Sequence, residues 1–192
     1  MQTEDFNRSI QLAEARESIM GSALARHFKA SLCFVDDSER RKEYDYSLYS
    51  SQIAWLYRIE QQDDYFITDM DSTLCIELFT FTKDGRKDGK LYYTKADKLC
   101  YVLNNLKKVI LLDVKILKQF IISLEHENLL QVFEPTDHDQ WKQQHNTNPT
   151  SCAILPIQET LLQDPKSRVI SFQELNIPLN YGQFQFKRNN ND

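Results

Sequence analysis

Acidic and amide side chains recur in two neighbouring predicted strands of the first third of the chain. Asp45 lies in a predicted strand over residues 44–49, and Glu60 and Gln62 lie two residues apart in a strand predicted over residues 53–62. Side chains alternate between the two faces of a strand, so Glu60 and Gln62 share one face and Asp45 lies on the hairpin partner. Carboxylates grouped in this way can ligate Mg²⁺, which polarises a phosphoryl group and lowers the pKa of a bound water. These three residues are therefore candidates for a metal-dependent hydrolytic site, and ordinary solvent-facing strand positions are the alternative.

A further acidic residue, Glu17, lies in a helix predicted over residues 6–28. Apolar residues recur there every three or four positions, and Glu17 falls on the same stripe between Ala13 and Met20. An acid on a buried face is costly unless it is paired or binds a cation. We therefore expect Glu17 to point towards the same end of the sheet and to be a candidate metal ligand.

The elements that must position these side chains follow from the periodicity of the remaining sequence. The pattern predicts strands over residues 73–82, 108–114 and 153–155, helices over residues 94–105 and 116–124, a charged loop over 85–89 and an exposed insertion over 134–150. Thr94 is the expected N-cap of the first of these helices, with Asp97 at its third helical position. This order predicts an α/β (α+β) domain with a mixed β-sheet flanked by helices, over residues 1–182, followed by a polar tail over 183–192.

Composition restricts the setting of the protein. The formal net charge of the 192 residues is −5, which argues against general binding of polyanions. Six basic residues between Lys83 and Lys98 form either a solvated loop or a loop that follows a nucleic-acid backbone. No apolar run approaches the roughly 18–20 residues of a membrane helix, and the acidic N-terminus is unlike a secretory signal. The four widely separated cysteines indicate free thiols, and we expect a cytoplasmic protein without a membrane partner.

Several short motifs occur in an order that resembles the PD-(D/E)XK nuclease superfamily. Members of that superfamily carry a Glu on the first helix, an Asp on one strand and E-x-K or D-x-K on the next, an order that Glu17, Asp45 and residues 60–62 follow. Residues 74–78 and 89–97 resemble the "IE…G…TKAD" stretch of phage and bacterial nuclease-like proteins. Residues 109–120 and 153–157 resemble the ending of the same group. The resemblance covers roughly residues 10 to 165 and implies a restriction-endonuclease-like fold.

The resemblance implies a DNA endonuclease that depends on Mg²⁺ or Mn²⁺. Glu17, Asp45 and Glu60 would hold the metal, Gln62 would position the attacking water and Lys95 would contact phosphate. Gln62 replaces the usual lysine, and an amide supplies no positive charge to the phosphate in the transition state. Two alternatives stay open: a non-catalytic protein on the same fold that binds nucleic acid or a protein partner, and an unrelated α/β domain. A homodimer is also compatible with the sequence.

Overall fold

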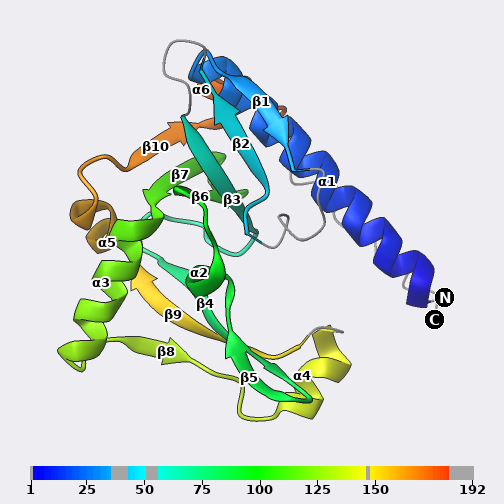
Figure 1. Cartoon of the computed structure of the whole chain (residues 1–192), viewed down its shortest axis with the longest axis vertical. Helices are drawn as coiled ribbons and strands as arrows, with labels where there is room; N and C mark the ends of the chain where they lie inside the picture. Colours follow the sequence, from blue (N-terminus) through cyan, green and yellow to red (C-terminus); the bar gives the residue numbers. More distant parts are fainter. Residues whose placement is uncertain (1, 36–42, 51–55, 146–147, 182–192) are drawn as a thin grey trace.

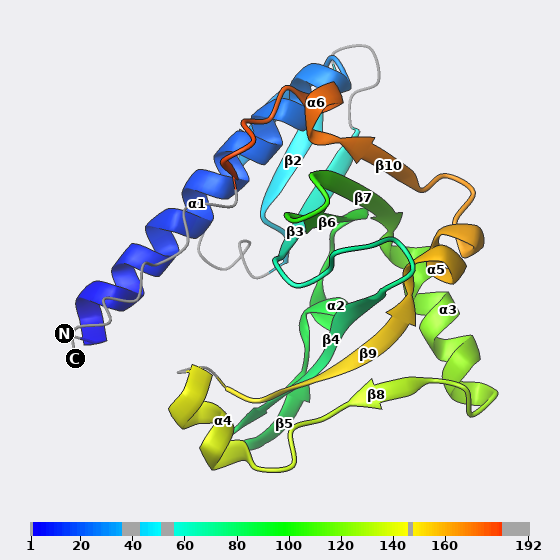
Figure 2. The same ribbon diagram turned by 180° about the vertical axis from the view of Figure 1, so that it is seen from behind.

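The structure is a computed structural model, and it describes residues 2–35, 43–50, 56–145 and 148–181. These residues form two β-sheets and six helices (Figures 1 and 2), which confirms the predicted mixed α+β class. The beginning of the strand predicted over residues 53–62 and the polar tail predicted over 183–192 lie outside the described residues.

The larger sheet, sheet A, has six strands and is mixed. Its strands lie in the order β1 (Ser31–Phe34), β2 (Tyr46–Tyr49), β3 (Tyr57–Asp64), β6 (Lys98–Leu103), β7 (Lys108–Asp113) and β10 (Arg168–Ser171). Strands β3 and β6 pair in parallel, and the other neighbours pair antiparallel. The two strands that are parallel neighbours, β3 and β6, lie at the centre of this sheet.

The smaller sheet, sheet B, has four antiparallel strands. They lie in the order β5 (Gly85–Asp88), β4 (Thr73–Thr82), β9 (Thr150–Pro156) and β8 (Gln131–Phe133). The described helices are α1 (Gln2–His27), α2 (Lys90–Tyr93), α3 (Val114–His126), α4 (His138–His145), α5 (Ile157–Gln163) and α6 (Phe172–Leu175). Of the helices in the described part of the chain, none combines the length and the apolar character needed to span a bilayer.

Helix α1 covers one face of sheet A. Its buried residues Met20 and Leu24 belong to the same hydrophobic cluster as Tyr46 and Leu48 of β2 and Ile59 of β3. Figures 1 and 2 both show α1 as a long rod that passes over β1 and β2 and extends beyond the sheet. Burial of this apolar stripe is what holds α1 against the sheet.

The other face of sheet A packs against sheet B and α3. Leu74 and Ile76 of β4 share a second hydrophobic cluster with Leu99 and Tyr101 of β6 and with Leu117 of α3. The two sheets therefore share one hydrophobic core on this side. The side chains of β3 that point into this region belong to the alternate set, the one that does not contain Ile59.

Several predicted elements coincide with the observed ones. Strand β4 spans the residues predicted for it, 73–82, and β7 and α3 begin and end within two residues of their predicted bounds. The charged segment predicted as a loop over 85–89 forms β5 instead, because its backbone pairs with the end of β4 in a tight hairpin.

The helix predicted over residues 94–105 is wrong. Residues 98–103 form the strand β6, in which every side chain is buried. A strand between two others buries both of its faces, so it shows no polar alternation and its apolar run can be mistaken for part of a helix. Thr94 does not cap a helix: its hydroxyl donates to the carbonyl oxygen of Glu43 (2.7 Å) and accepts from the backbone N–H of Ala96 (3.1 Å).

Candidate functional site

A cavity of about 280 Å³ lies where sheet A faces the middle of β4. Its polar lining residues are three charged residues, two amides, two threonines and two cysteines: Glu60, Glu77, Lys90, Gln61, Gln62, Thr94, Thr150, Cys75 and Cys152. Leu91, Leu99 and Val114 are among the apolar residues that complete the wall. Charged groups against an apolar wall are typical of ligand sites in proteins.

Glu60 is the most buried acid of this wall. It lies on β3 opposite Leu99 of β6, on the face of sheet A that packs towards sheet B, and its side chain is 3% exposed. Its Oε2 atom is buried and makes no hydrogen bond within the described part of the chain. A buried carboxylate in this position needs a cation, a proton or a ligand to offset its desolvation.

Asp45 lies beside Glu60 across the β2–β3 pairing. Tyr46 of β2 pairs with Ile59 of β3, so the antiparallel register continues to place Asp45 opposite Glu60. The Oδ2 atom of Asp45 accepts a hydrogen bond from the backbone N–H of Gln61 at 2.7 Å. The carboxylate is thus held against β3, with 12% of its side chain exposed.

Lys90 brings the two carboxylates together. Its ammonium nitrogen contacts Oε1 of Glu60 and lies 3.9 Å from Oδ1 of Asp45. Lys90 is the first residue of α2, and the preceding Gly89 lies directly against β4: its N–H donates to the carbonyl oxygen of Leu78. A Cβ atom on Gly89 would come within 2.6 Å of the Leu78 backbone, so glycine permits the approach that places Lys90 in the site.

Burial controls the ionisation of this cluster. Desolvation raises the pKa of the Glu60 carboxyl to about 8, and Asp45 adds to the increase, while the Lys90 ammonium opposes it. Desolvation lowers the pKa of Lys90, but attraction to Glu60 and then to Asp45 outweighs it, so that this pKa lies above its ordinary value. Lys90 therefore stays protonated, and Glu60 exchanges a proton near neutral pH.

Gln62 lies on the same face as Glu60, as the alternation predicted. Its Nε2 atom donates to the carbonyl oxygen of Cys75 at 2.9 Å and to the hydroxyl of Tyr101 at 3.4 Å. The backbone N–H of Cys75 donates to the same hydroxyl. The amide of Gln62 is therefore fixed between the two sheets at the edge of the cavity.

Glu77 adds a further carboxylate to the wall opposite Glu60. It lies on β4 across from Cys152 of β9, and its Oε1 atom accepts a hydrogen bond from the hydroxyl of Thr80 at 2.6 Å. The nearby phenol of Tyr93 has a pKa raised mainly by burial, and both Glu77 and Glu60 add to the increase. The negative charge of the cavity is therefore shared between β3 and β4.

The structure does not place Glu17 in this wall. Glu17 is half-buried on α1, and α1 packs on the face of sheet A that carries Ile59, the face opposite to Glu60. Because Met20 and Leu24 pack against the Ile59 face, α1 and with it Glu17 lie on that side of sheet A. The part of the chain that the structure describes contains no group of three or more His, Cys, Asp or Glu side chains arranged to hold a metal. The expectation that Glu17 joins the other two acids gains no support from this geometry.

Lys95 also lies outside the cavity wall. It follows α2 in a loop, its ammonium pairs with Oε1 of Glu43 at 2.5 Å, and its side chain is 61% exposed. The basic residues between Lys83 and Lys98 do not form a single surface, because Lys98 is buried against Asp113 and Lys90 is in the cavity. Lys90 was not among the site residues predicted from the sequence. The signal was a lysine directly after a glycine in the "IE…G…TKAD" stretch.

Two carboxylates of the site, those of Asp45 and Glu60, are the type of ligand that a hard divalent cation takes. Mg²⁺ is commonly held by one or two carboxylates and completes its shell with waters and substrate oxygens. Asp45 and Glu60 supply two carboxylates that face one point, and the buried Oε2 atom of Glu60 is available as a ligand. The Lys90 ammonium now occupies the position of positive charge between them, so a metal would have to displace it towards the cavity.

Together the fold and the cavity define a two-sheet α+β protein with a buried carboxylate–lysine cluster at the junction of its sheets. No protein-family model, no curated protein and no solved structure matches the chain.

Proposed function

We propose that the protein is a Mg²⁺- or Mn²⁺-dependent endonuclease that hydrolyses phosphodiester bonds in DNA, on the plan of the PD-(D/E)XK superfamily. The observation that carries the proposal is the convergence of Asp45 and Glu60 on one cation, the ammonium of Lys90, beside the cavity. Two carboxylates that already share one positive charge can share a divalent ion in the same place. The order of Asp45 and Glu60 along the chain follows the motif of the superfamily, and Gln62 stands where that motif has a lysine.

Each residue of the cluster has a role in this proposal. Asp45 and Glu60 would hold the metal, which would polarise the phosphoryl group and lower the pKa of a bound water. Gln62, fixed by the Cys75 carbonyl and the Tyr101 hydroxyl, orients the attacking water. Lys90 replaces Lys95 as the source of positive charge, because Lys90 lies in the cavity wall and Lys95 does not. Its ammonium stabilises the charge that develops on the phosphate, as the missing lysine at position 62 would.

A second candidate function is favoured by one observation, the pairing of both carboxylates with the ammonium of Lys90. A cluster of this kind is stable without a metal, so the same fold serves equally as a non-catalytic protein that binds nucleic acid. In that case Lys90 is a permanent counter-ion of Glu60 and stays in place when divalent cations are added.

Plasmid nicking with purified protein tests the proposal. We expect cleavage with Mg²⁺ or Mn²⁺ and none in EDTA, and loss of cleavage in Asp45→Asn and in Glu60→Gln. The matched control is Glu159→Gln, which removes an exposed carboxylate from the first turn of α5. Wild-type protein that is inert with both metals on single-stranded, duplex and branched DNA, or variants that cleave as well as the wild type, would overturn it.

A further inference from the structure

An open groove of about 520 Å³ adjoins the cavity on the side of α3. Four of the eight residues that line it are basic: Arg58, Lys95, Lys115 and Lys118. Thr94 and Val114 line both the groove and the cavity, so the two adjoin each other at these residues. A groove of this charge beside the carboxylate cluster is unexpected in a chain whose net charge is −5.

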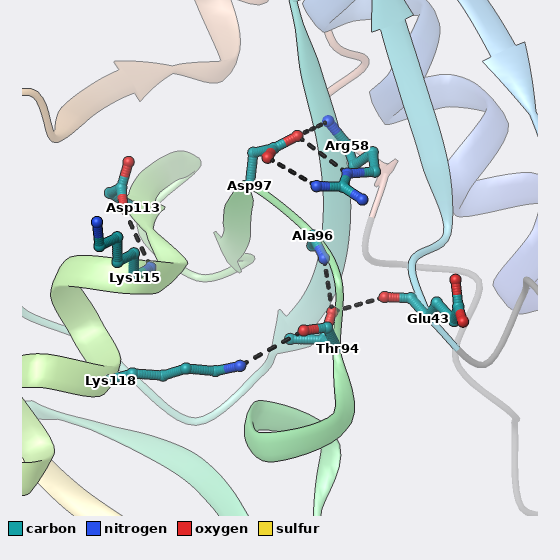
Figure 3. A network of polar contacts seen from close by, with 8 residues as sticks. All are labelled: Glu43, Arg58, Thr94, Ala96, Asp97, Asp113, Lys115 and Lys118. Atoms are coloured by element: carbon teal, nitrogen blue, oxygen red, sulfur yellow. Dashed lines mark hydrogen bonds and ion pairs between the residues drawn. The ribbon is translucent and has the colours of Figure 1, made fainter.

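The acids around this groove are already paired. Asp97 accepts two hydrogen bonds from the guanidinium of Arg58 and one from its backbone N–H, as Figure 3 shows. Glu43 pairs with Lys95. These two acids offset the two basic side chains that they contact, and neither neutralises another cation of the groove.

Both carboxylate oxygens of Asp113 also have partners. Its Oδ2 atom pairs with Lys98 at 3.3 Å, and its Oδ1 atom caps α3 by accepting from the backbone N–H groups of Lys115 and Ile116. The N-terminus of α3 is thus capped by a side chain. The positive charge of the groove therefore comes from lysine side chains.

Among the residues that the structure describes, no acidic side chain pairs with Lys115 or Lys118. The ammonium of Lys118 extends towards α2 and donates to the carbonyl oxygens of Tyr92 (3.3 Å) and Thr94 (3.4 Å), and Figure 3 shows the second of these contacts. Carbonyl oxygens orient the ammonium but do not cancel its charge. Partial burial lowers the pKa of Lys118, a change that a bound anion would reverse.

We propose that this groove binds the phosphodiester backbone of a nucleic-acid strand next to the carboxylate cluster, with Lys115 and Lys118 as its phosphate contacts. The inference rests on the proposed function for the kind of ligand, but binding in the groove does not require cleavage. Oriented lysines hold phosphates by charge, and such contacts carry little sequence information. Because the groove adjoins the cavity at Thr94, a strand held in the groove would lie beside the cavity that Glu60 lines.

Fluorescence anisotropy with labelled strands tests the groove. The Glu60→Gln protein keeps the probes intact in Mg²⁺, and the probes are single-stranded DNA, duplex DNA and single-stranded RNA of one sequence. In this background, Lys115→Gln/Lys118→Gln should weaken binding of the preferred probe about tenfold or more at moderate salt. Loss of two contacts should also reduce the slope of log K against log salt by about 1.8 on duplex DNA or about 1.4 on a single strand.

The matched control is Lys29→Gln/Lys166→Gln, which removes the same charge from two exposed lysines outside the groove. The proposal requires that the control bind with nearly unchanged affinity and salt slope. Equal losses in both double variants, or no loss in the groove variant, overturn it, and so does the absence of binding to all three probes. Thermal melting of each variant shows whether it is folded.

The same variants separate this inference from the proposed function. If the wild type binds through Lys115 and Lys118 but cleaves no substrate, the groove does bind nucleic acid and the proposed endonuclease activity is wrong. If cleavage by the wild type depends on Glu60, and the groove variant cleaves and binds as well as the wild type, the endonuclease activity is supported and the proposed binding in the groove is wrong.

Discussion

The ammonium nitrogen of Lys90 contacts the Oε1 atom of Glu60 between the two sheets. The same nitrogen lies 3.9 Å from Oδ1 of Asp45, so one positive charge serves two carboxylates. One negative charge therefore remains, and either a proton on Glu60 or a further cation would balance it.

The Glu60 carboxyl should titrate near pH 8 in the folded protein. Burial raises the pKa of Glu60 to about 8, and we expect ¹³C NMR of its side-chain carboxyl carbon to show a midpoint in this range. Lys90→Met should move that midpoint higher, because the Lys90 ammonium is the largest influence that lowers it. A midpoint near the ordinary value of about 4.5 would contradict the burial seen here.

Stability should fall as pH rises over the same interval. The folded-state pKa of Glu60 is raised above its unfolded value, so the folded protein holds this proton more tightly. Its contribution is complete below about pH 4.5 and is lost as the pH rises through about 8. Urea unfolding at a series of pH values measures this, and Glu60→Gln should flatten the dependence. An equally steep dependence in the variant would assign it to other groups.

Binding of a divalent cation should release a proton. Ligation requires the ionised form of Glu60, so the affinity for Mn²⁺ should increase with pH up to about 8. Calorimetry in buffers of different ionisation enthalpy counts the protons released, and Glu60→Gln should abolish both binding and release. Glu159→Gln serves as the control, and equal affinity at low and high pH would remove Glu60 from the ligand set.

The positive charge of the site should be movable from Lys90 to position 62. Lys90→Gln should lower metal-dependent cleavage by about 100-fold, because one charged donor to the phosphate is lost. Adding Gln62→Lys should restore part of that loss, since a lysine there reaches the same edge of the cavity between Cys75 and Tyr101. Cleavage rates of the single and double variants measure this coupling. If the two substitutions act independently, Lys90 does not replace the missing lysine.

Gly89→Ala should disturb the site through the backbone. A Cβ atom at position 89 would meet the backbone of Leu78, so α2 must move away from β4 at a cost of about 1–3 kcal/mol of unfolding free energy. That movement displaces Lys90 and should raise the pKa of Glu60, which NMR can follow. The control is Gly85→Ala, where φ is +108° and open space surrounds the Cα. It should destabilise the hairpin and leave the Glu60 titration unchanged.

Local pattern was sufficient for elements whose environment is simple. The alternation in β4, the apolar run of β7 and the stripe of α3 all reflect neighbours that bury a predictable set of side chains. Strand β6 was mistaken for a helix because it is buried on both faces, and only its two partner strands decide that. The division of the strands into two sheets is equally non-local, since β3 pairs with β6 and not with the adjacent β4.

The sequence by itself determined the shared face of Glu60 and Gln62 and the position of Asp45 on the neighbouring strand, because strand alternation and hairpin pairing are local. Only the tertiary structure decided which cation joins them. Lys90 reaches Glu60 because Gly89 packs against the backbone of β4, a contact between residues far apart in sequence. Likewise, α1 lies on the opposite face of sheet A, where its apolar stripe is buried, and this placement separates Glu17 from the wall that Glu60 forms.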